Sequence, residues 1–149
     1  MSALMDTLPL LGWRERAALP ELGLGGIVAK IDTGAYSCAL DVAWRREEAH
    51  DGVAQVVFAL RDEAGGAGRV LRAPIVDRRE VTDASGDCAR RVFIRTRLRL
   101  GDWERDVDLG LVDRQGLRHR MLIGRAALAG HWCVDPGRTF LLGAGEVAQ

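Results

Sequence analysis

Residues 90–100 carry the feature that most narrows the fold, because apolar and basic side chains alternate there. From residue 92 onward every second residue is apolar except Thr96, and the residues between them are arginine except Phe93. A period of two residues is the spacing at which side chains of a β-strand return to the same face. We therefore expect a long strand with one buried face, joined by a glycine turn to a second strand at residues 103–111.

Strand signals also dominate the rest of the chain, separated by turn residues. Further strands are expected at residues 10–18, 27–31, 53–60 and 69–76, and a strand, a Pro-Gly turn and a strand at residues 132–142. Helix is expected only for a turn or two at residues 43–49 and for one short helix at residues 125–129. This pattern predicts an all-β, closed, barrel-like fold with one short C-terminal helix. A chain of 149 residues fits a single domain, here residues 1–149 with a core at about residues 10–142.

Composition narrows the class of function. The 21 basic and 21 acidic residues cancel, so nothing favours binding to nucleic acid or to a membrane surface. The chain has no apolar run near the roughly 20 residues of a membrane span, and its start does not resemble a signal peptide. Three cysteines without close spacing favour reduced thiols, so we expect a cytoplasmic protein.

The tetrapeptide Asp32-Thr33-Gly34-Ala35 follows an apolar run at residues 27–31. An aspartate on a tight turn after a buried strand has a specific use, because two such turns placed face to face put two carboxylates on one water. Such a pair holds one proton and serves as base and acid at once. The chain has one copy of the motif, so the second aspartate must come from a second chain in a homodimer. An ordinary turn stabilised by its own side chains is the competing interpretation.

A second element lies about 90 residues further on, at Leu122-Ile123-Gly124-Arg125, and precedes the expected short helix. We expect this apolar strand to pass through the loop that carries Asp32. Glycine at position 124 would let the two backbones approach closely.

Together these motifs resemble the retropepsin-like aspartic peptidase family often labelled "ATP-dependent zinc protease". Gly12-Trp13-Arg14-Glu15 opens the match, Lys30 to Ala35 carries the hallmark, and Val134-Asp135-Pro136 lies near its end at residue 142. The resemblance implies a retroviral-protease-like fold and catalysis by Asp32, with Thr33, Gly34 and Ala35 forming the active-site turn and Ile123, Gly124 and Arg125 supporting it. Some members are associated with ATP-grasp ligases that add glutamates to a ribosomal protein, which implies a peptidase that trims glutamate tails.

The chain departs from the family after the hallmark. Tyr36-Ser37-Cys38 stands where the family reads Arg-Thr-Ser, and in retroviral enzymes an acid at position 36 pairs with the arginine equivalent to Arg125. Arg125 therefore needs another partner here, and Asp41 and Asp135 are both candidates.

The resemblance also implies a hairpin that covers the substrate, with glycine at its tip. Ser85-Gly86 is the favoured position because it adjoins the long strand at residues 90–100, and residues 65–68 are the alternative. The flap backbone, together with Gly34, would hold an extended peptide by strand-like hydrogen bonds.

Neither a metal nor a cofactor is expected. His50, His119 and His131 are scattered, no His-Glu-x-x-His exists, and no phosphate-binding glycine loop ends in lysine. Cys38 has no histidine placed to activate it, so a buried thiol is expected.

The residues therefore favour an aspartic endopeptidase that acts as a symmetric homodimer on a peptide or protein substrate. One rival is a non-catalytic module on the same fold that binds a peptide or an ATP-grasp glutamate ligase. A metallopeptidase is the second rival, and the missing ligand spacing argues against it.

Overall fold

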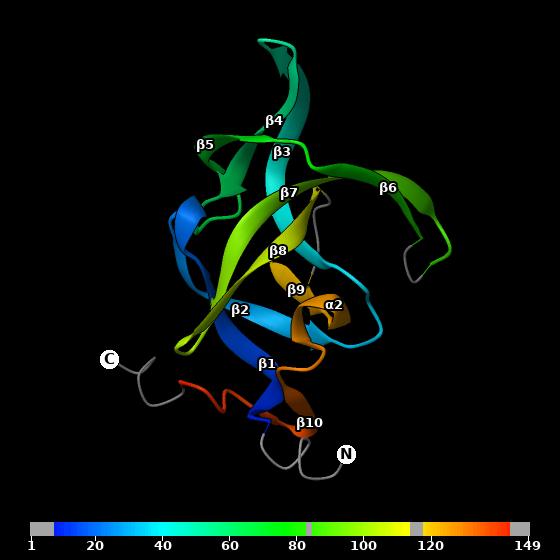
Figure 1. Cartoon of the computed structure of the whole chain (residues 1–149). Coiled ribbons are helices and arrows are strands. Elements are labelled where there is room, and N and C mark those ends of the chain that lie inside the picture. Colours follow the sequence, from blue (N-terminus) through cyan, green and yellow to red (C-terminus); the bar gives the residue numbers. More distant parts are fainter. Residues whose placement is uncertain (1–7, 83–84, 114–117, 144–149) are drawn as a thin grey trace.

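The computed structural model describes residues 8–82, 85–113 and 118–143, and these are almost entirely β-strand (Figure 1). The elements are β1 (Leu10–Leu19), the 3-10 helix η1 (Pro20–Leu22), β2 (Leu24–Asp32), β3 (Cys38–His50), β4 (Val53–Arg61), β5 (Ala67–Pro74), β6 (Asp77–Thr82), β7 (Cys88–Leu100), β8 (Trp103–Val112), β9 (Met121–Gly124), α2 (Arg125–Leu128) and β10 (Cys133–Thr139). The expected all-β fold with one short α-helix near the C-terminus is confirmed.

Six strands close into a barrel in the order β1-β2-β9-β3-β8-β7, and the pairing of Ala18 with Arg99 joins β7 back to β1. β10 adds to the outside of β1 and β6 to the outside of β7. The far part of β3 leaves the barrel and pairs with β4, which in turn pairs with β5, so these strands form an arm at the top of Figure 1. The predicted closed barrel is thus confirmed.

The interior of the barrel is filled by the apolar faces of these strands. The alternation in β7 is confirmed, since Val92, Ile94, Thr96, Leu98 and Leu100 are all buried. Phe93 lies on the opposite face and is nevertheless fully buried. The guanidinium of Arg79, from the neighbouring β6, lies 4.2 Å from the centre of its ring and covers it.

Two expectations of secondary structure are wrong. Residues 43–49 are not helical, because they continue β3 and pair residue by residue with β4; tertiary pairing overrides the helix propensity of alanine, arginine and glutamate there. Residues 132–142 are not two strands around a turn. Pro136 and Gly137 lie within one strand, β10, where the register against β1 shifts between Gly12 and Arg14.

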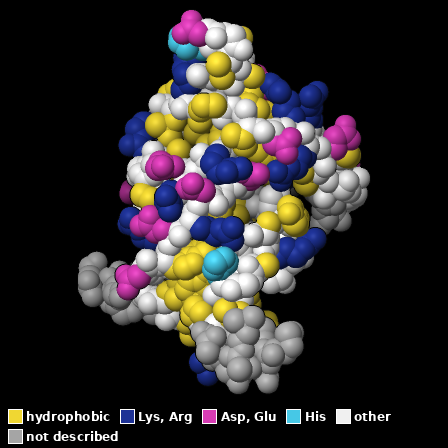
Figure 2. All heavy atoms as spheres, viewed as in Figure 1, with side chains coloured by type: hydrophobic (Ala, Val, Ile, Leu, Met, Phe, Trp, Pro, Cys, Tyr) yellow, Lys and Arg dark blue, Asp and Glu magenta, His cyan; other side chains and the backbone are white. Residues whose placement is uncertain are grey.

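The surface is mixed in charge, and Figure 2 shows basic and acidic side chains interspersed over the visible strands. A buried carboxylate, Glu15, accepts hydrogen bonds from the N–H groups of Gly12, Leu141 and Leu142, and so ties the segment after β10 to β1. Within the described ranges, no helix is long and apolar enough to cross a membrane.

Candidate active site

Asp32 is the last residue of β2, and its side chain is partly buried at the start of a tight turn. The N–H of Gly34 donates to Oδ1 of Asp32 at 3.1 Å, and the N–H of Ala35 donates to the Asp32 carbonyl at 3.1 Å. The carboxylate is therefore oriented by the main chain of its own turn, with Oδ1 engaged.

The strand β9 passes through the loop between β2 and β3, as expected. β9 pairs in parallel with β2, where Gly124 lies opposite Asp32, and antiparallel with β3. At its end the N–H of Arg125 donates to the Ala35 carbonyl at 2.8 Å and the N–H of Ala126 to the Tyr36 carbonyl at 2.9 Å. The turn that carries Asp32 is thus closed over the end of β9 by backbone hydrogen bonds.

Gly124 is required by this close passage and not by its backbone conformation. Its φ of −87° and ψ of 170° are open to any residue. A Cβ at this position would lie 2.5 Å from the carbonyl oxygen of Ser37 and 2.7 Å from the carbonyl carbon of Tyr36. Because those atoms belong to the backbone of the loop, no rotation of a side chain could relieve the overlap.

Arg125 contacts neither of the acids expected for it. Its Nη1 donates to the carbonyls of Thr33, at 3.4 Å, and Gly34, at 3.2 Å, and its guanidinium lies 5.4 Å from the centre of the Tyr36 ring. Asp41 instead forms a buried pair with Arg61 (2.6 Å) and Asp135 pairs with Arg138 (3.3 Å), so both candidate partners were wrong. Tyr36 offers a ring face in place of a carboxylate.

A cavity of about 800 Å³ opens in front of Asp32. One wall is the turn itself together with Leu122 and Arg125, and the other is β6 from Arg79 to Thr82 with Arg91 of β7. Tyr36 lies at the edge with its side chain largely exposed. This volume is within the range of clefts that hold a substrate.

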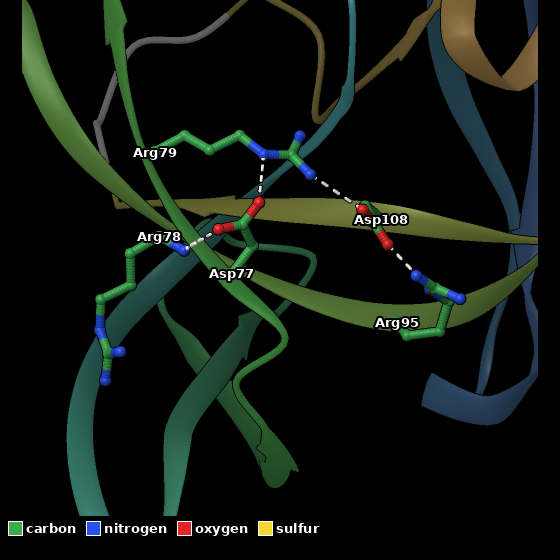
Figure 3. Close-up of polar contacts among 5 residues, drawn as sticks. All are labelled: Asp77, Arg78, Arg79, Arg95 and Asp108. Atoms are coloured by element: carbon green, nitrogen blue, oxygen red, sulfur yellow. Dashed lines mark hydrogen bonds and ion pairs between the residues drawn. The ribbon is translucent and has the colours of Figure 1, made fainter.

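The β6 wall is held by an ion-pair network (Figure 3). Arg79 donates to Asp77 at 2.7 Å and to Asp108 of β8 at 2.9 Å, and Arg95 donates to the second oxygen of Asp108 at 2.8 Å. The two carboxylates raise the pKa of Arg79, with Asp77 the larger cause. Arg79 is therefore a fixed cation at the junction between the Asp32 cavity and the outer strands.

Ser85 and Gly86 lie in the connection between β6 and β7, and Gly86 has a φ of 92° that suits glycine. The alternative turn at residues 65–68 joins β4 to β5, and none of its residues lines the Asp32 cavity. The hairpin that starts from the cavity wall is therefore the one that contains Ser85 and Gly86, and their role as a flap stays a prediction.

None of the motifs singled out in the sequence identified the β6 side of the cavity. The alternation of Arg79, Glu80, Val81 and Thr82 just before Ser85 could have indicated a strand feeding that hairpin.

Cys38 follows the turn and is buried, as expected, and burial raises the pKa of its thiol to about 11. Among the described residues, no three histidine, cysteine, aspartate or glutamate side chains converge as a metal site.

Comparisons with known proteins agree with this geometry. A family model described as "RimB-like: Retropepsin-like aspartic endopeptidase RimB" matches residues 10–144. The chain is 31% identical over 140 residues to a probable alpha-L-glutamate ligase of Shewanella halifaxensis, covering 93% of this chain and 31% of that protein. It is 33% identical over 140 residues to a protein of the same name from Parasynechococcus marenigrum, covering 90% and 29%.

The chain thus spans about a third of the length of these curated relatives. A crystal structure of a Legionella pneumophila protein of unknown function has the same fold, with a TM-score of 0.74 at 24% identity, covering 90% of this chain and 98% of that one. On the family match over nearly the whole chain, this protein belongs to the RimB-like family of retropepsin-like aspartic endopeptidases.

Proposed function

We propose that the protein is an aspartic endopeptidase whose active form is a two-fold homodimer, with Asp32 of each copy facing the same water. One ionised carboxylate takes a proton from the water, while the protonated one hydrogen-bonds the carbonyl of the scissile peptide. The observation that carries the proposal is the position of Asp32, at the mouth of an 800 Å³ cavity on a turn closed over Gly124. Two-fold assembly supplies the second carboxylate, which a single motif cannot.

Each part of the turn has a role in this mechanism. The N–H of Gly34 orients the carboxylate of Asp32 through its Oδ1. Thr33 is exposed, which leaves its hydroxyl available to the turn of the second copy. Ser85 and Gly86 form the flap connection, and the backbone of Gly34 and of that hairpin binds an extended peptide.

The substrate we propose is a glutamate tail of the kind that an ATP-grasp ligase adds to a protein. Among the described residues, Arg79, Arg91 and Arg125 line the cavity together with two acids, Asp32 and Glu80. Arg79 is already paired with Asp77 and Asp108, so the attraction for an acidic substrate comes mainly from Arg91 and Arg125. Acidic side chains therefore enter this cavity more favourably than basic ones. The curated relatives are larger proteins named as glutamate ligases, and these names also point to a substrate that contains glutamate.

Asp32→Asn tests the proposal. The substitution preserves shape and removes the ionisable group that each copy contributes to the dyad. Cleavage of a peptide that ends in a run of glutamates should therefore fall at least about 10³-fold. The melting temperature and the dimer, measured by calorimetry and light scattering, should stay unchanged. Near-native turnover by the purified variant would show that Asp32 does not take part in catalysis.

Mixing wild-type and Asp32→Asn chains tests whether one active site needs Asp32 from both copies. If each active site needs two aspartates, activity should fall more steeply than the wild-type fraction, because mixed dimers are inactive. The pH–rate profile of the wild-type enzyme should decline at both ends, since only the state with one shared proton is active. Activity in simple proportion to the wild-type chain would mean that each chain works alone.

A non-catalytic binding module on the same fold is the second candidate, and exposed Tyr36 favours it. This aromatic ring is 62% exposed beside Arg125 at the cavity edge, a combination suited to holding a peptide. In that case the glutamate-tailed peptide binds wild-type protein and Asp32→Asn equally and stays intact with both.

A further inference from the structure

β2 extends beyond the start of the strand β9 that pairs with it at Asp32. β2 and β9 pair only from Ala29 to Asp32. Upstream of β9, the carbonyl of Arg120 accepts a hydrogen bond from the N–H of Asp41 (2.8 Å), which draws this segment toward β3. Between residues 26–28 and residues 118–120 lies a cavity of about 420 Å³, which we call the basic cavity.

One wall of the basic cavity is an open strand edge. Ile27 and Val28 pair with β1 on one side, and β9 begins its pairing only at Ala29. On that second side of β2, no described strand pairs with residues 26–28. Gly26 departs from extended backbone, with a φ of 70°, and its carbonyl accepts a hydrogen bond from Nη1 of Arg16 at 3.5 Å. Alternate N–H and C=O groups of a strand point to each side, so the short edge at Ile27 and Val28 can accept one more strand.

The other walls are basic. Arg14 from β1 and the segment from Arg118 to Arg120 line the cavity, and none of the described residues that line it is acidic. Within the described residues, neither Arg14 nor Arg118 nor Arg120 forms an ion pair, in contrast to the arginines of Figure 3. The Nε atoms of Arg14 and Arg120 are buried and have no acceptor. The Nη2 of Arg120 donates to the carbonyl of Arg61 at 3.1 Å. The described lining of the cavity thus carries positive charge without an acidic side chain.

His119 gives a second sign of this potential. The pKa of its imidazole is lowered first by burial and then by the charges of Arg14, Lys30 and Arg118. Lys30 thus adds a further positive charge near the cavity. The ring of Trp13 packs against both side chains, with the His119 ring at 6.0 Å and the guanidinium of Arg14 at 4.6 Å.

We propose that the basic cavity binds an extended acidic peptide as an additional strand on β2, separate from the Asp32 cavity. The open edge supplies main-chain hydrogen bonds, and alternate carboxylates of the peptide face Arg14, Arg118 and Arg120. Residues 26–28 lie four to six positions before Asp32, or roughly 13–20 Å along the strand. The two cavities share no lining residue. A small anion would leave the strand edge unused, which is why a peptide is the better fit.

Binding is tested with a fluorescein-labelled peptide that alternates glutamate and serine, followed by anisotropy on the full chain carrying Asp32→Asn, so that the peptide stays intact. Arg118 is exposed and free of ion pairs, so Arg118→Glu should leave the fold unchanged. It replaces attraction by repulsion and should raise Kd by about tenfold. Arg46→Glu, the same change on the distant β3–β4 arm, is the matched control and should leave Kd within about twofold.

Two further probes separate a strand-edge site from a simple anion site. A peptide N-methylated at alternate residues should bind at least about tenfold more weakly, because it cannot donate to the open edge. In NMR spectra the peptide should shift the ring signals of His119 and leave those of His50, at the end of the arm, unmoved.

Equal effects of Arg118→Glu and Arg46→Glu would overturn the proposal. Undiminished binding of the N-methylated peptide, or displacement by inorganic phosphate at equal concentration, would replace it by a simple anion site. Tighter binding of a single-stranded oligonucleotide than of the peptide would also reject it. None of these results depends on whether Asp32 is catalytic.

Discussion

The two ends of β2 differ in how the chain uses them. We call the end that carries Asp32 the closed end. There the backbone folds over Gly124, and Arg125 donates hydrogen bonds to two carbonyls of the turn. At the other, open end, the neighbouring segment diverges, and Gly25 and Gly26 have free space around them. In the part of the chain that the structure describes, no acidic side chain lines the basic cavity beside its arginines. The closed end therefore fixes geometry through the main chain, whereas the open end presents charge on side chains.

This difference predicts which changes each end tolerates. At the closed end a single added carbon collides with backbone and distorts the turn of Asp32. At the open end the same change meets solvent, and only the charge of the side chains matters.

Gly124→Ala should produce the largest effect. Its Cβ would overlap the backbone at Ser37 and Tyr36, so the free energy of unfolding should fall by about 3 kcal/mol in urea titrations. Gly25→Ala is the matched control at the open end, where nothing lies within 4 Å of the new Cβ. That variant should stay within about 1 kcal/mol of the wild type. Equal stability of the two variants would contradict the proposed difference between the closed and open ends of β2.

The reactivity of the thiols should differ between Cys38, at the closed end, and Cys88, at the surface. Cys38 follows the turn, and with a pKa of about 11 roughly one thiol in a thousand is ionised at pH 8. Iodoacetamide should therefore modify Cys38 at least about a hundredfold more slowly than exposed Cys88, as measured by peptide mass spectrometry. The difference should disappear in guanidinium. Comparable native rates would show that the turn opens readily.

Arg125→Met should loosen the turn without unfolding the protein. Loss of the two bonds to the carbonyls of Thr33 and Gly34 should lower kcat about tenfold on the glutamate-tailed peptide, since these bonds orient the Asp32 turn. Arg46→Met, on the arm, should leave kcat unchanged. An effect confined to KM would mean that Arg125 contacts substrate instead of positioning the turn.

The smallest effect concerns His119 at the open end. Because the folded-state pKa lies below its ordinary value of 6.5, the unfolded chain binds more protons as pH falls through 6.5, and stability declines toward acid pH. His119→Gln should remove that part of the decline between about pH 7.5 and 5.5. The control His50→Gln, at an exposed position, should decline like the wild type. A variant His119→Gln with the wild-type slope would show that His119 is not the source of this decline.

The closed end could be predicted from sequence because its determinants are short and chemical. Asp32 on a turn after an apolar run, and an apolar-apolar-Gly segment 90 residues later, suffice to expect the passage of β9 through the loop. The partner of Arg125 could not be predicted, since its contacts are main-chain carbonyls that no residue type identifies.

Other features depend on tertiary pairing. The composition of residues 43–49 favours helix and does not indicate that β4 pairs along them. The basic cavity is assembled from β1 and the segment before β9, which lie more than 100 residues apart and meet only through the barrel order. The run Arg118-His119-Arg120 is basic in the sequence, but nothing local places it beside Arg14 and the edge of β2.

The passage of β9 through the Asp32 loop also determines when the site can exist. Its hydrogen bonds join residues 35 and 36 to residues 125 and 126, so a long loop must close before the turn is held. Contacts of such separation form slowly, and during synthesis the turn stays incomplete until most of the chain has left the ribosome. A nascent chain therefore carries Asp32 without the strand that shapes its turn, and the Asp32 site assembles only after nearly all of the barrel is made.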